Sequence, residues 1–324
     1  MVKTVVFDAP GGPEVMKIID VDVPPPAKGE LHVRHTAIGV NYIDVYHRSG
    51  LYPVPLPGTL GLEAAGVVEA VGEGVKGFKP GDRIAYGNGP RGAYAEARNL
   101  PANRVLKLAK GVSDETAAAM MLKGMTVRFL LRQTYKVKRG ETLVFLPAAG
   151  GVGHIFGQWA KAIGAKAIGV VGSDEKIETA KAHGYAHVIN SRTDDVAKRV
   201  REITGGKGVP VVYDGVGKAT FMSSLDCLQP RGLMVSFGNA SGPVTGVDLG
   251  ILAAKGSLYL TRPSLVTYVA DDSDLYESGR EVLEMVKSGK VKIEINQRYP
   301  LADVVTTHRD LEQRKTTGTT ILIP

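Results

Sequence analysis

A glycine-rich turn joins a short apolar run to a helix-forming segment, and it constrains the fold more than any other feature of the chain. The run Thr142–Pro147 leads into Ala148-Ala-Gly-Gly-Val-Gly153, and His154–Ile163 then has polar and apolar residues at helical spacing. A strand, a glycine turn and a helix in this order match the dinucleotide-binding fingerprint, with alanine replacing its first glycine. A tight turn that binds nothing is the simpler interpretation, but the flanking elements favour a nucleotide site.

The residues of this turn have separate roles in that interpretation. Gly150 allows the backbone to approach a pyrophosphate, and Gly153 allows the helix to pack closely on the strand. The first N–H groups of the helix have no partner within it, so with the helix dipole they attract an anion. The predicted phosphate-binding residues are Ala149, Gly150, Gly151, Val152 and Gly153.

Short apolar runs alternate with helix-forming segments from Thr142 onward. The runs are Thr142–Pro147, Lys166–Val171, His187–Asn190, Val209–Asp214, Leu233–Phe237 and Ser257–Thr261, and the helical segments His154–Ile163, Glu175–His183 and Asp194–Ile203 separate the first of them. Strands separated by helices indicate βαβ units and a parallel sheet. We therefore predict an α/β protein with a six-stranded, doubly wound Rossmann sheet.

Residues 1 to about 120 have a different character, with many Gly and Pro residues between short β-like runs such as Leu31–Ala37. This pattern predicts a compact, mostly antiparallel β domain. Helices are expected over Ser113–Thr134 and Leu275–Ser288, and a final strand over Thr319–Ile323 is expected to return to the first domain. Because a chain of 324 residues exceeds what one core usually supports, we predict one domain of residues 1–122 with 267–324 and a second domain of residues 123–266.

Composition limits the class of protein. Hydrophobic residues make up 44% and charged residues 23% of the chain, which is ordinary for a soluble protein, and no run approaches the roughly 20 apolar residues of a membrane span. The segment Met1–Phe7 has the pattern of a first strand and not of a signal peptide, which predicts a cytoplasmic protein. Cys227 is the only cysteine, so intrachain disulfides and cysteine-rich zinc sites are excluded, and its position near a helix end indicates a buried thiol.

The residues after the second strand of the nucleotide fold indicate which dinucleotide binds. An acidic residue about twenty positions beyond the glycines usually binds the ribose of NAD, but this chain has Gly172 and Ser173 directly after the strand and Lys176 one helical turn later. A hydroxyl, a helix start and an ammonium suit a 2′-phosphate, and Arg192 after the third strand is placed to reach it. We therefore predict NADPH as the cofactor. Asp174 keeps NADH open as an alternative, and an ordinary capped helix is the simplest one.

Two motifs in the first domain carry a resemblance to a known family. Gly61-Leu-Glu-Ala-Ala-Gly66 is similar to a segment of the alcohol-dehydrogenase-like medium-chain reductases in which the zinc enzymes have Gly-His-Glu, and Leu62 replaces the histidine here. Ala37-Ile-Gly-Val-Asn-Tyr-Ile-Asp44 is similar to their second zinc motif, with Asn41 in place of the cysteine. The resemblance implies a GroES-like, mostly β catalytic domain beside the Rossmann domain, and no metal, because two of the expected zinc ligands are missing.

Further motifs narrow the resemblance to the bacterial NADPH:quinone oxidoreductases of the zeta-crystallin group, over essentially the whole chain. They are Asn41–Tyr46, Arg48–Pro53, Met121–Thr126, Ala148–Gly153, Val235–Asn239 and Thr261–Pro263. Such reductases often have a tyrosine near the 2′-phosphate where this chain has Ser191, so the NADPH preference rests on Ser173, Lys176 and Arg192. The resemblance implies substrate-side roles for Asn41, Tyr46 and Tyr52, with Asn41 also at the cofactor. It places Thr126 near the nicotinamide ribose and pyrophosphate, and Phe237, Gly238, Asn239 and Arg262 around the nicotinamide.

The missing metal ligands bear on the reaction. Without a metal nothing polarises an alcohol for oxidation, whereas quinones and conjugated enones accept electrons readily in an oriented, dry site. The resemblance therefore implies NADPH-dependent reduction of quinones in a cleft between the two domains, and reduction of activated C=C bonds is the alternative. Tyr46 and Tyr52 are as consistent with packing as with catalysis. We assign no general acid, since neither His154, at a helix start, nor His187, near a strand, is a convincing candidate.

Charge allows a third hypothesis, from another class. The net charge of +7 is concentrated in residues 123–262, which contain 19 Lys and Arg against 10 Asp and Glu. A polyanionic cofactor explains this excess, and so does a non-enzymatic protein that binds nucleic acid, although the basic residues are scattered and lack the interleaved aromatics of single-strand binders. The segment 256–261 is apolar for an exposed sheet edge, and because such edges need covering we predict a homodimer formed through it.

Overall fold

The computed structural model describes residues 1–108 and 110–324, and these form two compact units. Unit 1 comprises Met1–Met125, Val269–Lys287 and Ile293–Pro324, and unit 2 comprises Thr126–Tyr268 and Ser288–Lys292. Each unit has a hydrophobic core of its own. Within the described ranges, we find no helix with the length and apolar character that crossing a membrane requires.

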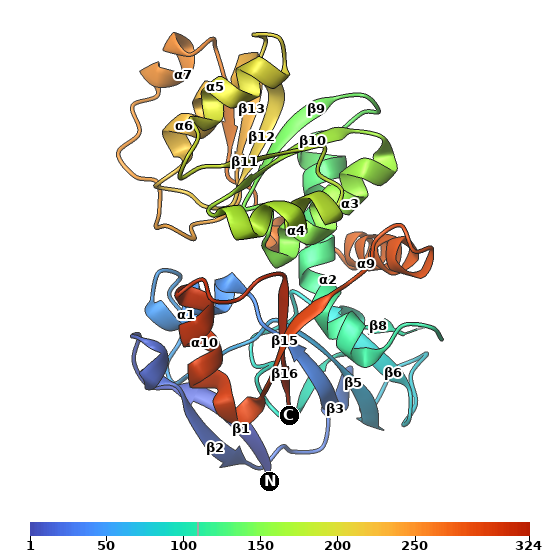
Figure 1. Ribbon diagram of the computed structural model, residues 1–324. Coiled ribbons are helices and arrows are strands. Elements are labelled where there is room, and N and C mark those ends of the chain that lie inside the picture. Colours follow the sequence, from blue (N-terminus) through green and yellow to red (C-terminus); the bar gives the residue numbers. More distant parts are fainter. Residues whose placement is uncertain (109) are drawn as a thin grey trace. The chain divides into compact units, whose positions relative to one another are not determined.

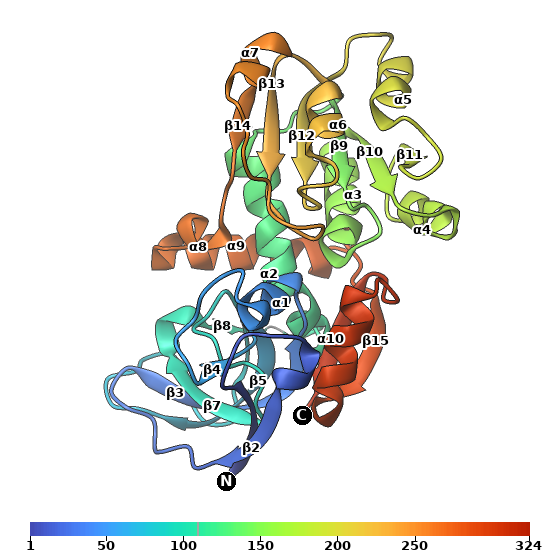
Figure 2. The same ribbon diagram turned by 90° about the vertical axis from the view of Figure 1, so that its left-hand side faces the viewer.

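Unit 2 contains the six-stranded parallel sheet that the sequence predicts. Its strand order is β11-β10-β9-β12-β13-β14, and Figure 2 shows β12 and β13 side by side with their arrowheads at the same end. The strands are β9 (Thr142–Leu146), β10 (Lys166–Val171), β11 (His187–Asn190), β12 (Val209–Asp214), β13 (Leu228–Ser236) and β14 (Tyr259–Thr261). The order changes direction at β9, which is the doubly wound arrangement whose ligands bind at the carboxyl ends of the strands.

Helices cover both faces of this sheet, with α3 and α4 on one side and α5 and α6 on the other (Figure 1). Their bounds are α3 (Gly151–Ile163), α4 (Ile177–Ala182), α5 (Val196–Ile203) and α6 (Phe221–Asp226), and the shorter α7 (Gly250–Ala254) and α8 (Leu265–Tyr268) follow. Val144 of β9 packs in the cluster that contains Phe221 of α6, whereas the next residue, Phe145, stacks on Phe156 of α3 at 4.1 Å between ring centroids. Because successive strand residues point to opposite faces, a strand buried on both faces is apolar throughout.

All five predicted helical segments differ from the observed ones at their ends. Of these, α5 begins two residues after the predicted Asp194, and α9 (Asp272–Lys287) begins three residues before the predicted Leu275. The helix after the glycine turn begins at Gly151, because the last residues of the turn already form its first turn and Gly150 is the N-cap. The segment expected over Glu175–His183 is a 3-10 turn, η4 (Asp174–Lys176), followed by α4. The long helix is α2 (Asp114–Phe129), continued by the π-helical η3 (Leu130–Thr134), in which the Leu130 carbonyl accepts from the Tyr135 N–H and from the Tyr213 hydroxyl.

Unit 1 is built mainly from antiparallel strands, as predicted. One sheet has the order β2-β1-β4, and the other has the order β15-β16-β3-β5-β6-β8, with β7 also paired to β3. The strands are β1 (Val2–Phe7), β2 (Lys17–Val21), β3 (Glu30–Gly39), β4 (Gly58–Thr59), β5 (Glu63–Val71), β6 (Arg83–Gly87), β7 (Ala97–Pro101), β8 (Leu106–Lys107), β15 (Ile295–Pro300) and β16 (Thr319–Ile323). Their inward side chains, among them Phe7, Leu31 and Ile84, form one core.

The C-terminal segment completes unit 1, which confirms the predicted return of the chain. β16 pairs antiparallel with β3, with Leu322 opposite Ile38, and α10 (Val304–Glu312) lies beside β15 (Figure 2). The helices α1 (Tyr42–Ser49) and α9 (Asp272–Lys287), and the short turns η1 (Pro13–Val15), η2 (Ala102–Arg104) and η5 (Leu301–Asp303), also belong to this unit.

Candidate active site

The glycine turn of unit 2 is held at the carboxyl end of its sheet. The Ala148 N–H donates to the carbonyl of Val170 in β10 at 2.9 Å. No side chain of the described residues caps the N-terminus of α3, whose N-cap is Gly150. The first N–H groups of the helix therefore remain available to an anion.

The glycines of this region differ in the space around them. A methyl group on Gly153 would lie 2.4 Å from the Ala148 carbonyl oxygen and 2.5 Å from that of Pro147, so close packing inside the protein excludes a side chain there. A methyl group on Gly150 would come no closer than 3.5 Å to a neighbour, and one on Gly172 would meet no described atom within 4 Å. Since neither has positive φ, packing and conformation leave Gly150 and Gly172 free to vary. Their open sides fit a ligand that approaches the backbone.

The ends of β10 and β11 bring the predicted 2′-phosphate residues together. Val171 and Asn190 are paired at the carboxyl ends of these two parallel strands. Ser173 and Arg192 each lie two residues further along the chain, in loops that leave the same edge of the sheet. Asn190 links the two loops, because its Nδ2 donates to Asp174 Oδ1 at 2.8 Å and its Oδ1 accepts the Arg192 N–H at 3.0 Å. The exposed Arg192 guanidinium has no partner in residues 1–108 and 110–324, and Lys176 is half-buried nearby in the chain.

A buried aspartate shapes the loop after β12. Asp214 is fully buried, and its Oδ1 accepts the N–H groups of Val216 at 2.7 Å and Gly217 at 3.0 Å. Its Oδ2 accepts the hydroxyls of Thr220 and Ser224, both at 2.7 Å. A carboxylate with four donors is satisfied in the interior, so Asp214 fixes the loop at the carboxyl end of the sheet.

The predicted nicotinamide-side residues of unit 2 follow the neighbouring strand, β13. The Phe237 N–H donates to the Asp214 carbonyl at 2.8 Å. A methyl group on Gly238 would lie 2.3 Å from the Gly215 carbonyl oxygen, so only glycine fits. The Arg262 guanidinium donates to the Ser236 carbonyl at 2.7 Å, which holds it at the end of β13 from which Phe237, Gly238 and Asn239 extend.

Asn41, Glu63 and Lys123 form a buried polar cluster in unit 1. Glu63 Oε2 accepts from Asn41 Nδ2 at 2.8 Å and from Lys123 Nζ at 3.1 Å, and its Oε1 accepts the Leu122 N–H at 2.7 Å. The side chains of Glu63 and Lys123 are 0% and 5% exposed. Because an ionised carboxylate only accepts hydrogen bonds, Asn41 must direct its amino group at Glu63 and its Oδ1 elsewhere. Gly39 leaves the space for the carboxylate, since a methyl group there would lie 2.4 Å from Glu63 Oε2.

A second buried chain of hydrogen bonds supports Asn41 from its backbone. The Asn41 N–H donates to Asp44 Oδ2 at 2.9 Å, and the Tyr94 hydroxyl donates to the same oxygen at 2.9 Å. His308 Nε2 lies 3.1 Å from the Tyr94 oxygen, and its Nδ1 lies 3.2 Å from a guanidinium nitrogen of Arg48. Because the guanidinium can only donate, His308 is neutral and carries its proton on Nε2. Burial, and secondarily Arg48, lower its pKa to about 3, in agreement with that tautomer, while burial raises the pKa of Asp44 to about 7.

The predicted tyrosines lie together beside α1. The rings of Tyr46 and Tyr52 are edge-to-face at 5.1 Å, and those of Tyr42 and Tyr46 at 5.4 Å. The Tyr52 N–H donates to the Tyr46 carbonyl at 3.0 Å. Asn41 starts the helix that carries Tyr46, so unit 1 brings its three predicted residues to one region. The remaining predicted residues, from Thr126 onward, belong to unit 2.

The histidine that follows the glycine turn is buried against a second histidine. The ring of His154 stacks on that of His183 at 3.7 Å, and burial, followed by the neighbouring histidine, lowers the His154 pKa to about 3. His154 is therefore neutral at pH 7. Cys227 is buried at the end of α6, which confirms the predicted structural thiol, and burial raises its pKa to about 12.

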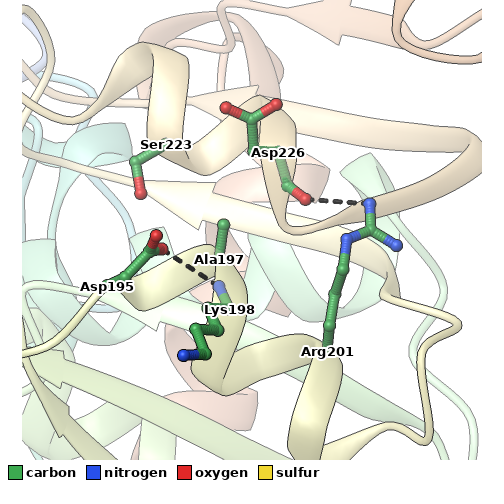
Figure 3. A pocket seen from close by; sticks show the side chains of 6 residues that line it. All are labelled: Asp195, Ala197, Lys198, Arg201, Ser223 and Asp226. Carbon is green, nitrogen blue, oxygen red and sulfur yellow. Dashed lines mark hydrogen bonds between the residues drawn. The ribbon is translucent and has the colours of Figure 1, made fainter.

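Six residues, four of them charged, line a hollow between α5 and α6 (Figure 3): Asp195, Ala197, Lys198, Arg201, Ser223 and Asp226. Asp195 caps α5 by accepting the Lys198 N–H at 3.0 Å, and Arg201 donates to the Asp226 carbonyl at 3.0 Å. The Asp226 carboxylate pairs with Lys255. Asp195, Arg201 and Asp226 are thus paired within the protein, and the two carboxylates balance the two cations of the lining. The hollow therefore does not have the character of a phosphate site.

Sequence reasoning missed four residues that organise these regions: Glu63, Lys123, Asn190 and Asp214. Glu63 and Lys123 stand inside quoted motifs, and charged residues in apolar surroundings are seldom buried unless paired. That signal points to an ion pair but does not identify the partners, because 60 residues separate Lys123 from Glu63. Asp214 and Asn190, each at the end of a strand, carry a similar weak signal.

Two family models match the chain. The alcohol dehydrogenase GroES-like domain matches residues 27–110, and the zinc-binding dehydrogenase model matches residues 151–283. The mostly antiparallel unit 1 and the parallel sheet of unit 2 agree with these matches. Fold and matches together define an oxidoreductase of the alcohol-dehydrogenase-like, medium-chain class.

Full-length relatives narrow this class. The chain is 52% identical over 325 residues to a quinone oxidoreductase of Pseudomonas aeruginosa, with 100% of both chains covered. It is 51% identical to the Escherichia coli quinone oxidoreductase solved in complex with NADPH, with a TM-score of 0.98 and coverage of 99% and 100%. A 2-haloacrylate reductase of Burkholderia sp is 44% identical, with 100% and 99% covered. The chain belongs to the quinone oxidoreductase group of the medium-chain dehydrogenase/reductase family. It is an enzyme, so the hypothesis of a non-enzymatic nucleic-acid-binding protein is wrong.

Proposed function

We propose that this enzyme reduces quinones with electrons from NADPH and without zinc. The observation that carries the proposal is the cluster of Asn41, Glu63 and Lys123. Zinc binds thiolate, imidazole or carboxylate ligands in fixed geometry, and Asn41 and Leu62 supply none of these. The Lys123 ammonium, 3.1 Å from Glu63, also puts a positive charge beside the one carboxylate of the motif, which opposes cation binding there.

This cluster favours a substrate that accepts electrons readily. Oxidising an alcohol requires its hydroxyl to lose a proton, and metal-dependent enzymes assist this with a Lewis acid. A quinone needs only orientation, a dry site and donors for the oxygen on which negative charge develops. The amide and ammonium groups beside Glu63 are donors of that kind.

NADPH fits the residues of unit 2. The turn Ala149–Gly153 binds the pyrophosphate, the open space beside Gly172 admits the adenosine ribose, and Ser173, Lys176 and Arg192 bind the 2′-phosphate. When bound, the nicotinamide supplies two electrons and one hydrogen. Thr126, Phe237, Gly238, Asn239 and Arg262 contact the nicotinamide half. The NADPH complex of the Escherichia coli relative supports the cofactor assignment.

Asn41, Tyr46 and Tyr52 are the proposed substrate-side residues, with Asn41 also contacting the cofactor. Glu63 fixes the Asn41 amide, so the Asn41 side chain offers a ligand one oriented N–H and one carbonyl oxygen. The paired rings of Tyr46 and Tyr52 offer an aromatic surface against which a flat quinone ring stacks.

A second candidate reaction is the reduction of activated C=C bonds. The 44% identical relative named 2-haloacrylate reductase supports this alternative, because its substrate class carries a conjugated double bond and not a quinone. The two reactions need the same cofactor, so substrate turnover must distinguish them.

Separate titrations with NADPH and NADH, followed by oxidation assays with a panel of quinones and a panel of enones, test the proposal. We expect tighter binding of NADPH and turnover with quinones that persists in EDTA. Inactivity with every quinone would rule out the first reaction, and activity with enones alone would establish the second. Asn41→Ala should lower kcat/KM about tenfold or more, because it removes an oriented donor. The control Asn103→Ala, at the exposed Asn103–Asp272 contact, should not.

Quaternary structure and location are further proposals. At the edge of the sheet of unit 2, Tyr259 and Leu260 of β14 are 62% and 37% exposed. An apolar edge strand of this kind is normally covered, and we propose that a second copy of the chain covers it in a homodimer. A cytoplasmic location stays a prediction.

A further inference from the structure

The buried ammonium of Lys123 has more N–H groups than the protein has acceptors for it. Its side chain is 5% exposed, and Nζ lies 3.1 Å from Glu63 Oε2. Within residues 1–108 and 110–324, Glu63 is the only partner of this nitrogen. Because an ammonium has three donors, two of them lack an acceptor in this part of the chain. Buried donors are almost always satisfied by protein, water or ligand.

The position of Lys123 indicates where the missing acceptor lies. Lys123 Nζ and Asn41 Nδ2 donate to the same oxygen, Glu63 Oε2, so the two nitrogens are neighbours within unit 1. Asn41 is the residue proposed to contact both the substrate and the cofactor. A ligand oxygen that reaches the Asn41 amide is therefore also close to the ammonium.

We propose that Lys123 donates a hydrogen bond to an oxygen atom of the bound ligands and supplies there the positive charge that a metal ion supplies in metal-dependent dehydrogenases. The oxygen belongs either to the carbonyl of the oxidant or to a hydroxyl of the nicotinamide ribose. This inference rests on the proposed function, because it assigns a further residue to the same site.

A positive charge at this position assists the chemistry of quinone reduction. In the net reaction, two electrons and one proton from the reduced nicotinamide, together with a second proton from water, convert a quinone into a hydroquinone. Negative charge develops on a quinone oxygen before that proton arrives. A preorganised cationic donor stabilises this charge without reorganisation, and Lys123 keeps its own proton over the cycle.

The competing explanation is that Lys123 only neutralises Glu63. The single variant Lys123→Met does not decide between the two, because it leaves a buried carboxylate without its counter-ion and destabilises the protein in either case. The double variant Lys123→Met/Glu63→Gln removes both charges together, and the glutamine oxygen still accepts a hydrogen bond. If Lys123 were only a counter-ion, this double variant would regain the activity of the wild type.

We expect the double variant to fold but to keep a kcat/KM for 1,4-naphthoquinone about 10²- to 10³-fold below wild type, the usual loss for one oriented donor. Lys123→Arg, which keeps a cationic donor, should recover part of the loss. The control variant Lys107→Met/Asp82→Asn removes a more exposed ion pair of the same unit, with Nζ to Oδ2 at 2.7 Å, and should behave like wild type.

Binding measurements on the double variant, compared with its kcat/KM, identify the ligand oxygen that Lys123 contacts. NADPH is titrated by its fluorescence and 1,4-naphthoquinone by calorimetry on the NADP⁺-loaded enzyme. An unchanged Kd for NADPH with a lower kcat/KM assigns the quinone oxygen, and a Kd raised tenfold or more assigns the ribose hydroxyl. Wild-type kcat/KM with both Kd values unchanged would overturn the inference. If the wild type turns over only enones, the quinone proposal fails, and the same comparison is made with the enone.

Discussion

Replacing Gly150 and Gly153 separately by alanine should give opposite results, although the two residues stand three positions apart in one turn. Gly153 is required by packing within the protein, whereas we expect Gly150 to be required only by the ligand. Each substitution adds the same methyl group to unit 2, so each variant serves as the control of the other.

The expected stabilities follow from the surroundings of the added methyl group. At Gly153 it would lie 2.4 and 2.5 Å from two backbone oxygens, which cannot move without distorting the backbone. Overpacking of this kind costs about 1–3 kcal/mol. For a unit of this size the melting temperature then falls by about 2–12 °C. At Gly150 the nearest atom is 3.5 Å away and the backbone angles, φ −85° and ψ 167°, suit alanine. Gly150→Ala should therefore be neutral or stabilise the protein by about 0.4–1 kcal/mol.

The expected affinities have the reverse pattern. A methyl group at Gly150 occupies the space through which the pyrophosphate reaches the start of α3. Loss of one hydrogen bond to a charged group costs about 1.5–3 kcal/mol, which corresponds to a Kd for NADPH raised about 10- to 150-fold. Well below its melting temperature, Gly153→Ala should lose less affinity for NADPH than Gly150→Ala, because α3 then keeps its position.

Thermal unfolding of the enzyme without cofactor and fluorescence titration with NADPH measure both quantities. A Gly150→Ala variant that binds NADPH as tightly as wild type would refute the assignment of the phosphate site. A Gly153→Ala variant with an unchanged melting temperature would refute the packing explanation.

Three further outcomes are expected. Arg192→Ala should raise the Kd for NADPH about tenfold and leave that for NADH unchanged, because one ion pair to the 2′-phosphate contributes about 1.4 kcal/mol; equal changes for both would remove Arg192 from the site. Burial lowers the pKa values of His154 and His308 to about 3 from 6.5, so at these two sites the folded protein binds fewer protons than the unfolded chain below pH 6.5. Asp44, whose pKa burial raises to about 7, offsets one of these two protons. The free energy of unfolding in urea should therefore fall between pH 6.5 and 4, by up to about 1.4 kcal/mol per pH unit for each histidine, and His154→Leu should reduce that slope. Tyr259→Lys at the edge of β14 should give a monomer by light scattering at a concentration where wild type is a dimer, and a monomeric wild type would contradict the proposed interface.

Local patterns in the sequence predicted the fold because the forces that form its elements act over short distances along the chain. The apolar runs Lys166–Val171, His187–Asn190 and Val209–Asp214 coincide with β10, β11 and β12, since a parallel sheet covered on both faces needs uninterrupted apolar strands. Some boundaries differ. The predicted strand Leu233–Phe237 begins earlier, as β13 (Leu228–Ser236), and the other differences lie mainly at helix ends. The last residues of the glycine turn form the first turn of α3, and the predicted helix over Glu175–His183 includes a 3-10 turn, because hydrogen bonding at helix ends depends on neighbouring elements.

The glycine motif by itself predicted where a dinucleotide binds, and the residues after the second strand predicted a phosphate beside it. These features depend on a strand, a turn and a helix that are consecutive in the chain. Asn41 and Leu62 likewise indicated, from the sequence alone, that two side chains that bind zinc in related enzymes are replaced in this chain.

Only the tertiary structure decided what replaces the metal ligands. Asn41, Glu63 and Lys123 come from the start of α1, from β5 and from α2, and 60 residues separate the carboxylate from the ammonium. No local sequence pattern predicts the contact between these three side chains, because it depends on how the strands and the helix of unit 1 pack. The burial that results makes the Lys123–Glu63 ion pair important, together with the Lys123 N–H groups that have no acceptor within residues 1–108 and 110–324, since a charge so far from water needs specific partners.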